Sequence, residues 1–134
     1  HNLPEGMVIG ASYAADLAEA GEDGRMMALV IGLHNIPEGM AVAVPLAAGG
    51  ASRGRAVLTT AAAGAPTVLG AVLGFCLGTM GPGLQMLTLG GASGAMLYVV
   101  FGELLPESFR LCRSPAPVMA AVLGVLTGMG VVFG

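Results

Sequence analysis

The stretch from Ala56 to Gly102 carries no charged side chain at all. A helix needs about 20 predominantly apolar residues to span the hydrocarbon core of a bilayer, so this stretch is long enough for two such helices. The segment TMGPGLQM (79–86) contains a proline and two glycines and is the expected turn between them. We therefore expect membrane-spanning helices.

The composition of the rest of the chain agrees with a location in lipid. Only 10% of the residues are charged and 55% are apolar, whereas a soluble domain carries about 25% charged residues. The 23 glycines are typical of helices that pack closely inside membranes. The five arginines are too few and too scattered for a nucleic-acid surface, so no nucleic-acid partner is expected.

Charged residues and turn residues divide the chain into five apolar segments. These predict an all-α, polytopic transmembrane helix bundle in a single domain, with four full helices and a leading half helix. The leading segment is too short to span a bilayer by itself. The predicted helices cover residues 1–15, 26–48, 56–78, 87–107 and 116–134, and an acidic loop covers 16–25.

The arginines predict the orientation in the membrane. Because consecutive helices alternate in direction, Arg53 and Arg55 fall on the same side as Arg110 and Arg113. Arginine-rich loops remain in the cytoplasm according to the positive-inside rule. We therefore expect a multi-pass protein of the cell membrane with its basic loops in the cytoplasm and its C-terminus outside.

Glycines at intervals of four predict faces on which helices approach closely. The expected faces contain Gly70, Gly74 and Gly78, then Gly90 with Gly94, and Gly124 with Gly128.

The most informative feature for function is a repeated motif. HNLPEGM at 1–7 recurs as HNIPEGM at 34–40, with six of seven positions identical, and both copies lie inside apolar segments. Ionisable residues within the membrane are expensive and usually mark a functional site. The repeat therefore indicates a site shared by two neighbouring helices.

The spacing within each copy favours metal binding. Residues four apart lie on one helix face, so His1 shares a face with Glu5, and His34 with Glu38. At about 1.5 Å per residue, both glutamates fall near the middle of a bilayer core roughly 30 Å thick. Imidazole, carboxylate and amide groups are ligands for divalent metals. The candidate ligands are His1, Asn2, Glu5, His34, Asn35 and Glu38.

Residues beside the two glutamates shape the predicted site. Pro37 lacks an N–H group and is expected to bend its helix beside the ligands. Gly6 and Gly39 are expected to permit close helix approach. An alternative for the whole cluster is a buried polar network that only locks the two helices together.

The segment GELLPES (102–108) contains a second pair of acidic residues. Glu103 and Glu107 are four residues apart and predict a secondary cation site or an exit path. In the alternative, both are interfacial charges, with Glu107 paired to Arg110 three residues later.

Two HNxPEG motifs in consecutive helices resemble the ZIP (Zrt/Irt-like) metal transporters. The resemblance covers nearly the whole chain and implies a partial ZIP fold, from the second half of the fourth helix through the eighth. It implies the same six metal ligands and uptake toward the cytoplasm of Zn²⁺, or of Fe²⁺, Mn²⁺ or Cd²⁺. It also implies a homodimer of the full-length protein in the lipid bilayer.

One departure and two rival classes qualify this expectation. Some prokaryotic members of the family have a Glu before the proline of the sixth helix that helps to bind a second metal, whereas Ala65 precedes Pro66 here. We therefore expect a single metal. An enzyme is not expected, because the HExxH pair of an intramembrane metalloprotease is absent. The remaining alternative is a transport-inactive metal-binding membrane protein or sensor.

Overall fold

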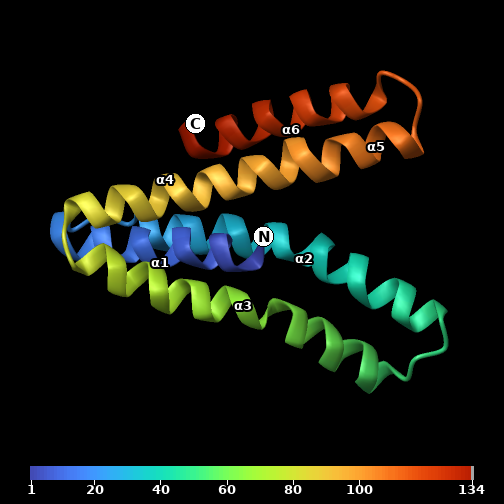
Figure 1. Ribbon diagram of the computed structural model, residues 1–134, viewed down its shortest axis with the longest axis horizontal. Coiled ribbons are helices and arrows are strands. Elements are labelled where there is room, and N and C mark those ends of the chain that lie inside the picture. The colour runs from blue at the N-terminus through green and yellow to red at the C-terminus, as the bar shows by residue number, and fades with distance from the viewer. Residues whose placement is uncertain (134) are drawn as a thin grey trace. The chain divides into compact units, whose positions relative to one another are not determined.

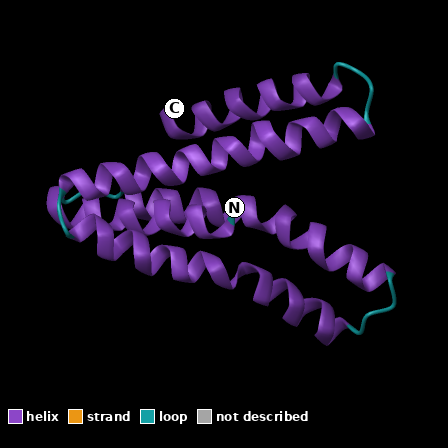
Figure 2. Ribbon diagram, viewed as in Figure 1, coloured by secondary structure: helices purple, strands orange, loops and turns teal. Residues whose placement is uncertain are grey.

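The computed structural model describes residues 1–133, and helices are the only regular elements among them (Figure 2). The predicted all-α class is therefore confirmed. The elements are α1 (Asn2–Glu19), α2 (Asp23–Ala48), α3 (Arg53–Thr79), α4 (Pro82–Tyr98), a π-helix η1 (Val99–Leu104), α5 (Leu105–Leu111) and α6 (Ala116–Phe133). The last predicted helix ends at residue 134, which lies outside the described residues.

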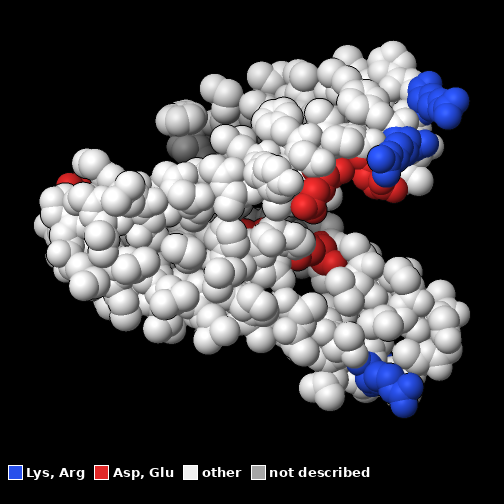
Figure 3. Space-filling model, in the orientation of Figure 1, with Lys and Arg blue, Asp and Glu red and all other residues white. Residues whose placement is uncertain are grey.

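Three helical stretches are long and apolar enough to cross a membrane. They are Asp23–Ala48, Arg53–Thr79 and Pro82–Leu111, and Ala116–Val131 is a shorter apolar helix. In the view of Figure 3, uncharged residues cover most of the helix surfaces, and the visible Arg residues lie at helix ends. This distribution is that of a multi-pass membrane protein.

The chain forms two compact units, His1–Met96 and Leu97–Gly134. In the first unit α1 packs against both α2 and α3, and α2 also contacts α3. The start of the chain lies partway along α2 and α3, so α1 accompanies only part of their length (Figure 1). The elements that carry the repeated motif, α1 and α2, therefore lie next to each other, with α3 beside both.

Small residues make the interface between α1 and α3. A Cβ atom at Gly70 would overlap the backbone carbonyl of Leu3, and one at Gly74 would overlap that of Met7. A Cβ atom at Gly78 would lie 2.6 Å from the Cβ of Ala14. The close-packing face predicted from Gly70, Gly74 and Gly78 is therefore confirmed.

The other glycine predictions had mixed outcomes. Gly6 contacts the backbone of Thr67 as closely as expected, but a Cβ at Gly39 would meet only the Thr60 methyl group, at an ordinary 3.5 Å. A Cβ atom added at any glycine of the remaining predicted faces would meet no atom of another element within 4 Å among residues 1–133, so the structure shows no close helix approach at these glycines. These faces contain Gly90, Gly94, Gly124 and Gly128.

The turn between α1 and α2 is shorter than the predicted acidic loop, 16–25. Asp16 remains helical, and its carboxylate accepts hydrogen bonds from the backbone N–H groups of Asp23 and Gly24, both at 2.9 Å. A carboxylate is favourable at a helix N-terminus, where N–H groups lack partners. Ala20 ends α1 in the left-handed conformation, with φ 52°. Asp16 thus caps α2, which allows both helices to extend into the segment expected to be a loop.

The helix α4 continues into the π-helix η1 and then α5. The N–H group of Leu105 bonds to the carbonyl of Val100, five residues earlier. Pro106 follows in the first turn of α5 and cannot donate to the carbonyl of Gly102, which favours a wider turn before it. The predicted helix 87–107 therefore contains a change of helix type that hydrophobicity did not indicate.

Candidate metal centre

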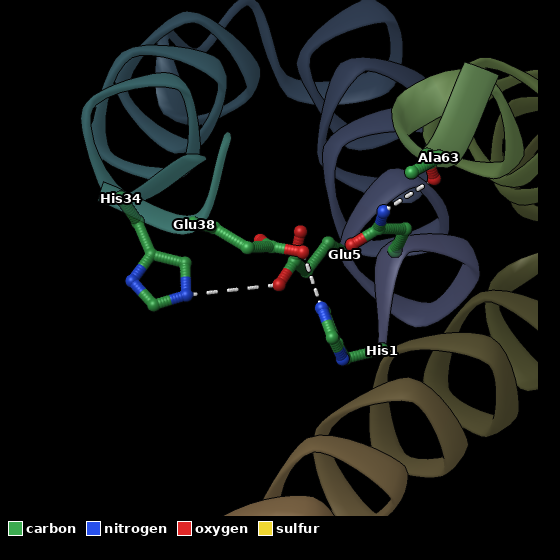
Figure 4. A network of polar contacts seen from close by, with 6 residues as sticks. His1, Glu5, His34, Glu38 and Ala63 are labelled. Carbon is green, nitrogen blue, oxygen red and sulfur yellow. Dashed lines mark hydrogen bonds and ion pairs between the residues drawn. The ribbon is translucent and has the colours of Figure 1, made fainter. Parts of the chain in front are cut away.

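The two copies of the motif face each other in antiparallel register. Nε2 of His1 contacts Oε1 of Glu38, and Nε2 of His34 lies 3.8 Å from Oε1 of Glu5 (Figure 4). The histidine of each copy thus approaches the glutamate of the other. This reciprocal arrangement depends on the register of the two antiparallel helices, which places the first residue of each motif opposite the fifth residue of the other.

The hydrogen bonds at the turn and the contacts between the two motifs fit one and the same register of α1 against α2. The same number of residues separates Asp16 from Glu5 on α1 as separates Asp23 from His34 on α2. The helices therefore run from the Asp16 cap to the motifs without slipping past each other.

Three candidate ligand groups gather at the centre of this arrangement. His1, Glu5 and Glu38 each offer an atom such that all three atoms lie within 4.8 Å of one another. The ligands of a tetrahedral zinc ion, about 2.1 Å from the metal, are roughly 3.4 Å apart. Small side-chain movements would therefore bring these groups around one cation. Glu5 is buried, whereas His1 is exposed, so the cluster opens to one side.

Asn35 lies between the two carboxylates. Oriented with its amide nitrogen toward them, it donates hydrogen bonds to Oε2 of Glu38 and Oε2 of Glu5, each at 3.0 Å. This orientation is assigned from the hydrogen-bond partners. A donor between two carboxylates reduces their repulsion, which a bound cation would do more strongly.

Asn2 differs from the other predicted ligands because it connects α1 to α3. Its Nδ2 donates a hydrogen bond to the backbone carbonyl of Ala63 at 2.7 Å. Its Oδ1 is buried and has no hydrogen-bond partner among residues 1–133. The structure thus brings together His1, Glu5, Asn35 and Glu38, places His34 at the edge of the cluster, and gives the nitrogen of Asn2 a partner on α3.

Comparisons with known proteins identify the family of the chain. The family model described as "ZIP Zinc transporter" matches residues 1–134. The chain belongs to the ZIP family. Because ZIP members are transporters, membership supports the expectation that the chain is not an enzyme.

Three curated relatives of this ZIP chain are zinc transporters by name. Zinc transporter GufA of Myxococcus xanthus is 44% identical over 82% of this chain and 42% of its own length. Zinc transporter ZIPB of Bordetella bronchiseptica is 41% identical over 82% of this chain and 35% of its own length. Zinc transporter foi of Drosophila melanogaster is 26% identical over 98% of this chain and 18% of its own length.

The chain spans less than half the length of these curated relatives. No solved structure matches the ZIP chain significantly.

Sequence reasoning missed the contribution of α3 to the candidate site. A cavity of about 200 Å³ adjoins the cluster, lined by Asn2, Asn35 and Glu38 and by Thr60, Ala63 and Thr67 of α3. Hydroxyl groups near a proline in an otherwise apolar span were the available signal, since polar groups within a membrane are seldom incidental.

The second acidic pair lies in the other unit. Oε2 of Glu107 lies 3.6 Å from Nη1 of Arg110, and both side chains are exposed. This is the arrangement expected if the two residues are interfacial charges. Such exposed pairs contribute little to stability. Glu103 lies in the π-helix, is exposed, and makes no ion pair with another residue of 1–133. The secondary or exit site at Glu103 and Glu107 stays a prediction.

Proposed function

We propose that the complete protein transports divalent metal ions across the membrane toward the cytoplasm, with zinc as the main substrate. The observation that carries this proposal is the convergence of His1, Glu5 and Glu38, whose ligand atoms lie within 4.8 Å of one another between two apolar helices. The zinc transporters that resemble the chain support zinc as substrate. Fe²⁺, Mn²⁺ and Cd²⁺ accept the same ligand types and are the alternatives.

In this proposal the metal binds near the middle of the bilayer. Asn35 is central in α2, a 26-residue helix that is about 39 Å long at 1.5 Å per residue. The second copy of the motif therefore lies far from both ends of a membrane-spanning helix. Pro37 and Pro45 lie inside this helix, and interrupted helices commonly form transporter sites at this depth.

The proposed ligands have different roles. His1, Glu5 and Glu38 hold the ion first, since their atoms already converge. His34 joins by a movement toward Glu5, and Asn35 turns its oxygen toward the ion once the carboxylates are neutralised. Asn2 keeps α1 against α3 or contributes its unpaired oxygen. One metal is proposed, because α3 has Ala65 rather than an acidic residue before Pro66.

The proposed direction of transport rests on the positive-inside rule, the exit path on two acidic residues, and the homodimer on the family resemblance. Arg53 and Arg55 begin α3 and mark the cytoplasmic side by the positive-inside rule. Glu103 and Glu107 would receive the ion on its way to the cytoplasm. A homodimer is proposed by resemblance to the family.

The proposal is tested by zinc uptake into proteoliposomes containing the complete protein and a zinc-sensitive dye. Glu38→Ala should lower uptake at least tenfold, because even indirect partners of metal ligands change affinity by about 10- to 100-fold. Glu19→Gln is the matched control, since Glu19 is an exposed acidic residue at the opposite end of α1. Equal uptake by the wild type and Glu38→Ala would exclude this route.

A transport-inactive metal-binding protein or sensor is the second candidate. The hydrogen bonds that already satisfy the cluster, between His1 and Glu38 and from Asn35, favour this candidate, since they hold α1 and α2 together without flux. Saturable zinc binding combined with no uptake by the wild type would identify it.

A further inference from the structure

The continuous helix from α4 to α5 changes its hydrogen-bonding pattern at η1 (Val99–Leu104). The N–H group of Leu105 donates to the carbonyl of Val100, five residues earlier rather than four. Such π-helices are rare, and they occur mostly as single turns at functional sites. This one is six residues long and lies inside a candidate membrane span, Pro82–Leu111. An element this uncommon needs a physical cause.

Pro106 and Gly102 supply that cause. In an α-helix the carbonyl of Gly102 would accept from the residue four positions later, but that residue is Pro106, which has no N–H group and whose ring crowds this carbonyl. Glycine inside a helix also lowers its stability. A π turn pairs each carbonyl with the residue five positions later, so Gly102 no longer depends on Pro106. The α and π forms are therefore closer in free energy here than in an uninterrupted helix.

The position of η1 in the chain is the second observation. The first compact unit ends at Met96, the second begins at Leu97, and η1 begins at Val99. No residue of η1 is buried within the described part of the chain, so packing there does not hold it in one form. Beyond it, α5 contacts α6, so both belong to one piece. A change of helix type at η1 would therefore move a whole unit.

We propose that η1 is a hinge that changes between the π and α forms during transport, with Pro106 keeping both forms accessible. This rests on the proposed function. Because a π turn contains more residues than an α turn, the change rotates α5 about the helix axis and alters the bend between α4 and α5. Glu103 lies within η1 and Glu107 follows it, so the two carboxylates of the proposed exit path turn relative to each other. A few residues that absorb such a change are typical of hinges.

Pairs of spin labels on the complete, metal-free protein measure the hinge directly. Leu87 and Leu111 are exposed and lie on either side of η1, and cysteines there carry the labels after Cys76 and Cys112 are replaced by serine. Pulsed electron paramagnetic resonance should give a broad or two-peaked distribution of distances between the labels. Val57 and Met80 are the matched pair, since both are exposed and flank α3, which contains a proline but is an α-helix throughout. Their distribution should be narrow, and equal widths for the two pairs overturn the hinge.

Pro106→Ala tests the role of the proline. The new N–H group can donate to the carbonyl of Gly102, which favours the α form. The distribution between Leu87 and Leu111 should narrow, and Vmax of zinc uptake should fall several-fold. KM should change much less, because no candidate metal ligand is altered. Pro117→Ala is the control, since Pro117 lies in the first turn of α6, where N–H groups have no partner within the helix.

The label distances need no zinc, so they separate the hinge from the proposed function. A broad wild-type distribution that narrows in Pro106→Ala supports the hinge even in a protein without zinc uptake. A distribution that Pro106→Ala leaves unchanged overturns it, even where uptake and its dependence on Glu38 are normal. A narrowed distribution with wild-type uptake overturns the role of the hinge in transport.

Discussion

Asn35 lies between the two acidic side chains of the candidate site. It donates to one oxygen of Glu5 and one of Glu38, each at 3.0 Å. Two adjacent carboxylates repel unless a donor or a cation lies between them. The metal-free cluster therefore depends on an amide nitrogen, and the metal-bound cluster would use oxygen atoms from the same residues.

Replacing Asn35 with aspartate should affect the metal-free and metal-bound forms in opposite ways. Asn35→Asp removes the donor and adds a third negative charge, which should lower the melting temperature of the metal-free protein by several degrees. The same charge attracts the cation, so saturating zinc should raise the melting temperature more than in the wild type. Thermal unfolding in detergent, with and without zinc, measures both effects.

Asn35→Ala separates the two causes. It removes the donor without adding charge, so its metal-free melting temperature should lie between those of the wild type and Asn35→Asp. A metal-free Asn35→Asp protein as stable as the wild type would mean that Asn35 does not relieve repulsion between Glu5 and Glu38.

At the level of elements, the site depends on how closely α1 approaches α3. The backbones meet where Gly70 and Gly74 face the carbonyls of Leu3 and Met7. Larger side chains at these positions would separate the helices and move the motif on α1 away from the motif on α2. At the turn, the hydrogen bonds from the N–H groups of Asp23 and Gly24 to the carboxylate of Asp16 set the register of α1 against α2.

Gly74→Ala should destabilise the protein despite the higher helix propensity of alanine. Its Cβ would overlap the carbonyl of Met7, and overpacking of this kind costs about 1–3 kcal/mol. The melting temperature in detergent should fall by about 5 °C. In the control Gly54→Ala, on the same helix, the added Cβ meets no described atom within 4 Å, so stability should stay equal or rise slightly. Equal melting temperatures for the two variants would argue against a close contact between α1 and α3.

At the level of the whole molecule, the arginines make the orientation in the membrane testable. The turn between α1 and α2 contains Glu22, and the turn between α2 and α3 contains Ala51. The positive-inside rule assigns the second turn, next to Arg53 and Arg55, to the cytoplasm.

Single cysteines introduced into the two turns should differ in labelling by a membrane-impermeant maleimide. The background is the complete protein in intact cells, with Cys76 and Cys112 replaced by serine. Glu22→Cys should react from outside, whereas Ala51→Cys should react only after permeabilisation. The reverse pattern would invert the proposed direction of transport.

Much of this molecule was predictable because lipid limits the possible structures. A backbone in hydrocarbon must satisfy its own hydrogen bonds, so apolar segments between charged turns predicted helices. Helical periodicity placed His1 with Glu5 and His34 with Glu38 on common faces. The Gly70, Gly74 and Gly78 face was also predictable, because small residues at intervals of four permit close approach.

Other features required the tertiary structure, because they depend on which atoms meet between helices. Spacing could not show that Asp16 caps α2 or that the π-helix precedes Pro106. The sequence alone determined that this protein is a bundle of membrane helices with two matching sets of candidate metal-ligand residues. Only the tertiary structure decided that Asn2 donates to the carbonyl of Ala63 on α3, since a donor finds an acceptor on another helix only where the two lie close in space.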